Sequence, residues 1–359
     1  MTKKICILIL LFVTLVSFTS CGKGQESEDA LSTLDNDKKE STVAEHKQTK
    51  KDGNENNEEA EIEVDVDYME GTEGIRPYAV MIDNEGTKCL PQGGLNLAQV
   101  IYEVIVEGGE TRLMPIFWNS EPELVGPVRS SRHYFLDYAM EHDAIYIHYG
   151  WSPMAENDIA KFKINNVNGV GYGGEIFWDL TKDINNWQDS YTSAEKIEQF
   201  IKKAGYRTET NKKQVFSYNR KDIEFEKGIK AEKVRLTYSS FNTCGFEYDA
   251  DVKTYKRFRQ GEPHMERVTG KQLEAKNIIV QYVNNYNIKG DNAGRQEVDT
   301  VGSGEGWYIT CGKAEKIRWS KASRPEPTIY TYEDGREILL NPGQTWVQIF
   351  PLYGKVEIE

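Results

Sequence analysis

The sequence predicts a protein of the α+β or α/β class, in which an N-terminal α/β sandwich domain is followed by a β-rich C-terminal domain. Between residues 71 and 210, apolar runs typical of strands alternate with helical patterns. Between residues 211 and 359, short strand patterns follow one another closely, with turn signals between them. The 359 residues are enough for two domains of ordinary size once a leader and a tether are set aside.

The first twenty residues have the features of an export signal. Two lysines at positions 3 and 4 precede an apolar run, Ile5–Val16, that is too short to span a bilayer comfortably. Residues 18–21 (FTSC) resemble a lipobox, in which small residues precede a cysteine that is lipidated. An ordinary signal peptide with a chance cysteine is the alternative. We expect a lipoprotein signal peptide over residues 1–20 and a lipid anchor on Cys21, at the outer face of the cytoplasmic membrane.

Residues 21–70 are predicted to be an acidic, disordered tether that follows the lipidated cysteine. They lack a sustained apolar pattern, and residues 22–67 alone hold fifteen acids and six bases. This stretch therefore carries −9 of the formal net charge of −13. The acidity belongs mostly to a solvated tether rather than to a binding face. We expect no nucleic-acid partner.

Three further cysteines, Cys89, Cys244 and Cys311, are scattered and lack the CxxC spacing of zinc sites. A Cys244–Cys311 bridge and three buried free thiols are the alternatives. The histidines are also scattered, without metal-ligand spacing. No metal site and no cofactor are therefore predicted.

The first domain has clear local signals. Pro115 indicates that its third strand is bulged or at an edge. Ser152 and Pro153 predict the start of a helix. Residues 192–195 (TSAE) form a capping-box pattern ahead of another helix, which ends before Gly205. The predicted strands are Tyr78–Asp83, Val100–Val106, Arg112–Trp118 and Ala144–His148.

The second domain is dominated by strand patterns. The Gly-rich segment Val301–Trp307 lacks the Lys-Ser/Thr of a phosphate-binding loop, so we predict a bulged hairpin or tight turn there. Tyr238, Tyr248 and Tyr255 are expected to be exposed, and either support cross-strand packing or form a stacking surface for sugar rings. The predicted strands are Val234–Tyr238, Phe246–Tyr248, Tyr255–Phe258, Ile278–Val283, Trp307–Thr310, Lys316–Trp319, Thr328–Tyr332, Ile338–Leu340 and Trp346–Phe350.

The strongest candidate for a functional site is Leu124–Asp137, which reads LVGPVRSSRHYFLD. A Gly-Pro loop runs into a helical pattern, and Arg129 and Arg132 flank Ser130 and Ser131 at the turn. A helix N-terminus presents unsatisfied N–H groups and partial positive charge. Guanidinium groups placed there predict an anion site, with a phosphate as its natural ligand.

Arg112 is expected to join this site from the preceding strand. The structural alternative is that the arginines pair with carboxylates such as Glu103 or Glu107, because arginine forks serve both uses. The sequence contains no GxSxG elbow, and no catalytic residue is assigned.

The chain resembles the YerB-like lipoprotein family. The amino-terminal domain of that family is matched over about residues 75–200, in the runs RPYAVMIDN, PQGGLNLAQVIYEVIVEGGETRLMPIFW, VGPVRSSRHYFLDYA and DAIYIHYGWSPMA. The carboxy-terminal domain is matched by VQYV, VGSGEGW and LNPGQTWVQI. The family occurs mainly in Gram-positive bacteria and has no assigned biochemical activity. The resemblance therefore implies location and domain plan, but little chemistry.

One position departs from the family pattern. The family usually has a His-Asn pair shortly before the Tyr-Thr that opens the last helix, whereas Gln188 and Asp189 precede Tyr191 and Thr192 here. If that histidine serves catalysis in the family, this chain has lost it.

A shorter stretch resembles the LytR-CpsA-Psr phosphotransferases, in its order of strand, acid or Gln, strand and Pro-x-Arg before a helix. Their Ser/Thr-Pro-Arg-Asp run is absent. This resemblance implies a metal-assisted phosphotransferase acting on lipid-linked glycans. The arginines would neutralise charge on the phosphoryl group, and a carboxylate such as Asp83 would hold the metal.

Taken together, the sequence predicts a membrane-anchored, extracytoplasmic lipoprotein that binds an anionic envelope ligand, such as a glycan, or a protein partner. The phosphotransferase is the enzymatic alternative. The third hypothesis is a scaffold that contacts a membrane protein through the β-rich domain.

Overall fold

The computed structural model describes residues 67–183 and 185–359. The predicted signal peptide, Cys21 and nearly all of the tether therefore lie outside the described residues. Within the described part, no helix is long and apolar enough to cross a membrane.

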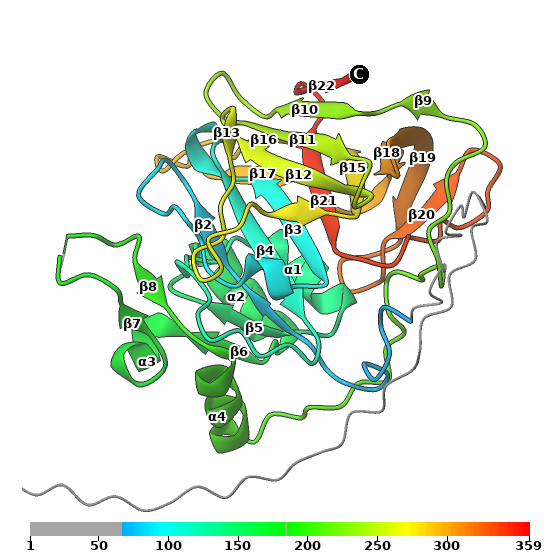
Figure 1. Cartoon of the computed structure of the whole chain (residues 1–359). Coiled ribbons are helices and arrows are strands. Elements are labelled where there is room, and N and C mark those ends of the chain that lie inside the picture. The colour runs from blue at the N-terminus through cyan, green and yellow to red at the C-terminus, as the bar shows by residue number, and fades with distance from the viewer. Residues whose placement is uncertain (1–66, 184) are drawn as a thin grey trace, which may run out of the picture. The chain divides into compact units, whose positions relative to one another are not determined.

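Twelve strands form the largest sheet. They are β1 (Tyr78–Val80), β2 (Ile82–Asn84), β3 (Val100–Ile105), β4 (Thr111–Phe117), β5 (Ile145–His148), β6 (Asn166–Asn168), β9 (Ile229–Lys230), β15 (Asn277–Val283), β18 (Gly302–Thr310), β19 (Lys313–Lys321), β20 (Ile329–Tyr332) and β21 (Thr345–Pro351). Their order is β20-β19-β18-β15-β21-β3-β4-β1-β5-β6, with β2 paired to β4 and β9 to β19. Because β21 pairs in parallel with β3, strands from both halves of the chain form one sheet (Figure 1).

A second sheet contains six strands and comes entirely from the second half of the chain. It consists of β10 (Lys233–Thr237), β11 (Thr243–Asp249), β12 (Thr254–Arg259), β13 (Glu262–Pro263), β14 (Glu274–Ala275) and β22 (Lys355–Ile358). Two small ribbons complete the strands: β16 (Asn285–Asn287) with β17 (Gln296–Val298), and β7 (Trp178–Asp179) with β8 (Ser190–Tyr191). The predicted mixture of an α/β half and a β-rich half is confirmed.

The helices all come from the first half. They are the 3-10 turns η1 (Leu95–Leu97) and η2 (Glu107–Gly109) and the α-helices α1 (Phe135–Glu141), α2 (Pro153–Phe162), α3 (Gly169–Ile176) and α4 (Ala194–Ala204). The predicted start of α2 is confirmed, since the Ser152 side chain caps it by accepting from the Ala155 N–H. Helix α4 ends at Gly205, as predicted, but its N-cap is Ser193 rather than Thr192. The Thr192 hydroxyl instead donates to the Ile176 carbonyl.

The central strand β3 shows how the layers are arranged. Successive strand residues point to opposite faces of a sheet. Tyr102 stacks on Tyr138 of α1, with ring centroids 4.8 Å apart, whereas Glu103 contacts Arg257 of β12. Helix α1 therefore lies on one face of the large sheet, and the six-stranded sheet lies on the other (Figure 1). Both faces of β3 are covered, which explains why every residue of this strand is buried.

In the first half, one predicted strand is interrupted, and one of the two alternatives for the Pro115 strand is excluded. The predicted strand Tyr78–Asp83 is interrupted at Met81, whose N–H donates to Ile147 and whose carbonyl accepts from Arg129. Pro115 lies in β4, which is not an edge strand, because β3 pairs with it on one side and β1 and β2 pair with it on the other. The interruption between β1 and β2 falls beside Pro115, which has no N–H to donate to a neighbouring strand.

Several predictions for the second half also need correction. The Gly-rich segment is part of strand β18, and a Cβ on Gly304 would lie 2.5 Å from the Trp319 indole nitrogen. Close packing, not a turn, therefore requires this glycine. Residues 338–340 form no strand, and Leu340 makes only an isolated bridge with Tyr218. Tyr238 and Tyr255 are buried, contrary to the expectation that they are exposed. Tyr248 is half-buried and packs against Tyr255 on the neighbouring strand, as the cross-strand packing alternative predicts. The three cysteines in the described residues are free and buried, as the second alternative predicted.

Candidate functional site

The arginine segment is not a helix N-terminus, contrary to the sequence prediction. Helix α1 begins at Phe135, so Arg129 and Arg132 precede it in the chain. Two backbone N–H groups of the segment are already used. The Arg129 N–H donates to Met81 and the Ser131 N–H donates to Gly150, both across 2.8–2.9 Å. The segment thus runs like a short strand, and its arginine side chains carry the positive charge.

This path also explains which segments meet at the site. Val128 forms a bridge with Ile82 of β2 on one side, and its N–H donates to the Ser190 carbonyl on the other. The arginine segment is therefore held between β2 and the strand β8. Residues that precede β8 along the chain are brought next to Arg129 as a result.

Arg132 is paired with a carboxylate that the sequence suggested. Its Nε lies 2.6 Å from Glu107 Oε1 and its Nη2 lies 3.0 Å from Glu107 Oε2. Burial raises the pKa of the Glu107 carboxyl, but the hydrogen bonds and charge of Arg132 outweigh it and leave the pKa below its usual value. The alternative that the arginines pair with carboxylates is therefore correct for Arg132 and Glu107. Glu103, the other carboxylate named, pairs with Arg257 of β12.

Arg129 contacts two acids and one aromatic ring. Its Nε lies 3.0 Å from Asp83 Oδ2, and its Nη2 lies 3.5 Å from Glu85 Oε2. The guanidinium carbon lies 4.0 Å from the ring centroid of Trp187, which is a cation–π distance. The Arg129 side chain is 15% exposed, so solvent reaches it.

Arg112 differs from the other two arginines because no carboxylate oxygen of the described residues lies within 4 Å of it. Its Nη1 donates to the Ser130 carbonyl across 2.5 Å, and its buried Nε has no hydrogen-bond partner among the described residues. Burial, and then the charges of Arg132 and Arg129, lower the pKa of Arg112 to about 10, although Asp83 and Glu107 act in the opposite direction. The group therefore remains charged at neutral pH.

The two serines have different surroundings. Ser130 is half-buried, and its carbonyl accepts from Arg112. Ser131 is fully buried, and its hydroxyl accepts from the Tyr146 hydroxyl across 2.9 Å. The structure thus brings Ser130 together with the three arginines, while the Ser131 hydroxyl faces the core.

The sequence analysis missed Trp187 and the role of Gln188. The Gln188 side-chain amide donates to Asp83 Oδ2 and to the Glu85 carbonyl, both across 2.9 Å. Gln188 stood out in the sequence only as a departure from the family pattern. No local signal indicated that it would contact Asp83.

Asp83 is fully occupied by protein partners. Besides the contacts with Gln188 and Arg129, its Oδ1 accepts from the Glu85 N–H across 3.0 Å. The phosphotransferase hypothesis assigned a metal to this carboxylate. Among the described residues, no group of three His, Cys, Asp or Glu side chains could hold a metal ion.

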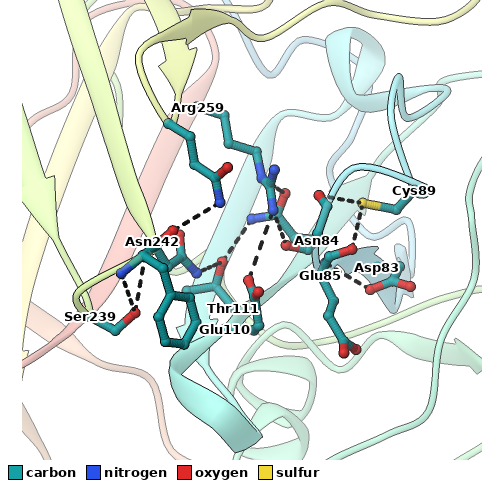
Figure 2. Close-up of polar contacts among 12 residues, drawn as sticks. Asp83, Asn84, Glu85, Cys89, Glu110, Thr111, Ser239, Asn242 and Arg259 are labelled. Atoms are coloured by element: carbon teal, nitrogen blue, oxygen red, sulfur yellow. Dashed lines mark hydrogen bonds and ion pairs between the residues drawn. The ribbon is translucent and has the colours of Figure 1, made fainter.

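The residue after Asp83 connects the site to the second half of the chain (Figure 2). Arg259 of β12 donates from Nε to the Asn84 side chain, across 3.0 Å, and from Nη2 to the Asn84 carbonyl, across 2.6 Å. The Asn84 amide in turn donates to Thr111, and Glu110 lies 3.9 Å from Arg259. The end of β2 thus contacts the arginine segment through Asp83 and the small sheet through Asn84.

Comparisons with known proteins agree with the resemblance in the sequence. Residues 67–207 match the domain family described as "Protein of unknown function (DUF3048) N-terminal domain". Residues 234–347 match the family described as "Protein of unknown function (DUF3048) C-terminal domain". A protein of Bacillus subtilis (strain 168), named "Putative lipoprotein YerB", is 31% identical over 283 residues, which are 77% of this chain and 81% of that protein.

A solved structure is also similar. The crystal structure of the YerB protein from Bacillus subtilis matches with a TM-score of 0.70 and 28% identity. The match covers 79% of this chain and 94% of that one. The chain therefore belongs to the YerB-like lipoprotein family, whose N-terminal and C-terminal domains are both domains of unknown function.

Proposed function

We propose that the protein is a lipoprotein anchored through Cys21 at the extracytoplasmic face of the membrane, and that its arginine cluster binds an anionic, phosphate-bearing envelope ligand. The arginine cluster is defined as Arg112, Arg129 and Arg132. The anchor is supported by the lipobox-like segment and by the lipoprotein name of the relative.

The observation that best supports an anion site is the charge of Arg112. Arg132 has Glu107 and Arg129 has Asp83, but Arg112 has only a carbonyl. A buried cation is costly unless it is paired. Two unit charges about 4 Å apart attract by about 4 kcal/mol at an effective dielectric constant of about 20. An anion seated beside Arg112 and Arg129 would give Arg112 the direct charged partner that the described residues do not provide.

The chemistry of the cluster fits phosphate better than a small halide. Guanidinium groups donate in a planar fork that matches two oxygens of one phosphate. The partly exposed side chain of Arg129, at 15%, offers donors at the surface end of the cluster, whereas Arg132 already donates to Glu107 and to the Ser131 carbonyl. Trp187 beside Arg129 lowers the local exposure to water, which strengthens electrostatic attraction.

The proposal is tested by isothermal titration of the full mature chain, in detergent micelles, with inorganic phosphate and pyrophosphate. We expect pyrophosphate to bind, and Arg112→Gln to weaken binding by at least about tenfold, or about 1.4 kcal/mol. The control is Arg318→Gln, which removes an exposed arginine of β19. Absence of binding, or equal loss in both variants, would contradict the proposal.

A further inference from the structure

Trp187 is held at the surface beside the arginine cluster. Its side chain is 55% exposed, although tryptophan is usually among the more buried residues. One face of the indole is covered by the Arg129 guanidinium at 4.0 Å. The rest of the ring is open to solvent, next to the position where an anion would meet Arg129.

The position of this indole is fixed by its neighbours in the chain. Gln188 is buried and bonds to Asp83 and Glu85, as described above. Asp189 is also buried, and its Oδ2 accepts from the Thr181 N–H and hydroxyl. Two buried polar anchors therefore follow an exposed aromatic side chain directly. This arrangement resembles a binding platform more than a side chain left exposed by chance.

A second exposed apolar side chain lies near Ser130. Val170 at the start of α3 is 67% exposed. Both the Ser130 hydroxyl and a Val170 methyl lie within 4 Å of the point that a Cβ on Gly150 would occupy. Exposed apolar side chains thus lie near both Arg129 and Ser130. A bare inorganic ion would contact none of this surface.

We infer that the ligand of the arginine cluster is a glycosyl phosphate, whose phosphate contacts Arg112 and Arg129 while its sugar ring lies on the exposed part of the Trp187 indole. This inference rests on the proposed function. A phosphate monoester keeps ionised oxygens for the guanidinium groups, and its ester oxygen leads directly to the sugar. The Trp187 indole lies 4.0 Å from the Arg129 guanidinium, so an aromatic surface adjoins the proposed phosphate position.

The C–H face of a pyranose is apolar and needs only one open face of an aromatic ring, which Trp187 provides. A nucleobase could stack on the same ring. The expected location outside the cytoplasmic membrane favours carbohydrate over nucleotide, and the experiment separates the two.

The test is titration of the full mature chain in detergent micelles with four probes: inorganic phosphate, glucose 1-phosphate, glucose and adenosine monophosphate. We expect glucose 1-phosphate to bind at least about tenfold more tightly than inorganic phosphate and than the nucleotide. Glucose alone should bind more weakly than glucose 1-phosphate. Equal affinity for glucose 1-phosphate and inorganic phosphate, or tighter binding of the nucleotide, would overturn the inference.

Variants at Trp187 separate this inference from the proposed function. Trp187→Ala should lower the affinity for glucose 1-phosphate to that for inorganic phosphate, and Trp187→Phe should restore most of it. The matched control is Trp178→Ala. This variant also removes an exposed tryptophan, but Trp178 lies in β7, opposite Tyr191 of β8. If Trp187→Ala weakens both probes equally, the sugar platform is wrong although the anion site remains. If inorganic phosphate, pyrophosphate and glucose 1-phosphate all fail to bind, the proposed function itself fails.

Discussion

Arg257 and Glu103 form an ion pair in which both side chains are fully buried, and Arg257 Nη2 donates to Glu103 Oε2 across 2.7 Å. The arginine comes from β12 of the small sheet and the glutamate from β3 of the large sheet. Arg257 Nε also donates to Nδ1 of His264, whose Nε2 lies 2.6 Å from Gln92 Oε1. Burial, and then the charges of Arg257 and Arg259, hold the pKa of His264 well below its usual value. The neutral imidazole therefore accepts from Arg257, in the second half of the chain, and donates to Gln92, in the first half.

Breaking this pair on one side should be strongly destabilising. Arg257→Met leaves the Glu103 carboxylate buried without its cation, and removal of one partner of a buried pair costs about 3–5 kcal/mol. We expect a loss of that size in the free energy of unfolding, measured by urea denaturation. The double variant Arg257→Met with Glu103→Gln should recover part of the loss, because no buried charge then lacks a partner. A single variant as stable as the parent would contradict the buried pairing.

The two halves of the chain are expected to depend on each other for folding. Strand β3 pairs with β21, and a second buried ion pair joins Lys321 of β19 to Glu141 of α1 across 2.5 Å. A fragment of residues 67–207 would expose the edge of β3 and leave Glu103 and Glu141 without their cations. We expect this fragment to lack a cooperative thermal transition by circular dichroism. Co-expression with residues 208–359 should restore the transition. A sharp transition in the isolated fragment would contradict the prediction.

Local patterns in the sequence predicted much of the secondary structure, because apolar alternation and caps depend on near neighbours. Ser152 as a cap and Gly205 as a helix end are examples. Strand order was not predicted. The parallel pairing of β3 with β21 joins segments far apart in the sequence, and no local pattern encodes such a pairing.

The candidate site was predicted in part for the same reason. Arg132 pairs with Glu107, which the sequence named as an alternative. Glu103 was named as well, but its partner is Arg257, which lies in the other half of the chain. Trp187 reaches Arg129 only because the segment after it pairs with the arginine loop. Contacts of that kind depend on tertiary structure, which the local sequence does not specify.

Two buried groups are expected to give the protein opposing dependences on pH. Burial lowers the pKa of His142 to about 4, with Glu141 raising it and Lys321 lowering it further. A depressed histidine pKa means that stability is present above pH 6.5 and is lost as the pH falls towards 4. Burial raises the pKa of Asp137 to about 6, against the charge of Arg324. The contribution of Asp137 is therefore present below pH 4 and is lost as the pH rises towards 6.

Each shift corresponds to about 3 kcal/mol, since one pKa unit is about 1.4 kcal/mol. These two contributions to the free energy of unfolding should thus largely offset each other between pH 4 and 6. His142→Gln should leave stability falling as the pH rises through this range, and Asp137→Asn should leave it rising. Urea denaturation at several pH values measures both slopes, with His46→Gln in the predicted tether as a control that should change neither. Parallel slopes in the two variants would contradict the assignment.

The lipid anchor is a separate prediction that depends only on the first residues. If Cys21 carries the lipid, Cys21→Ala should abolish acylation and release the protein from the membrane, because the acyl chains are the predicted means of attachment. Mass spectrometry of the purified protein and its partition between membrane and soluble fractions measure the two effects. Cys6→Ala is the matched control, because Cys6 lies within the predicted leader and would be removed with it. The control should remain acylated and membrane-bound. A Cys21→Ala protein that stays in the membrane fraction would show that the attachment does not depend on this cysteine.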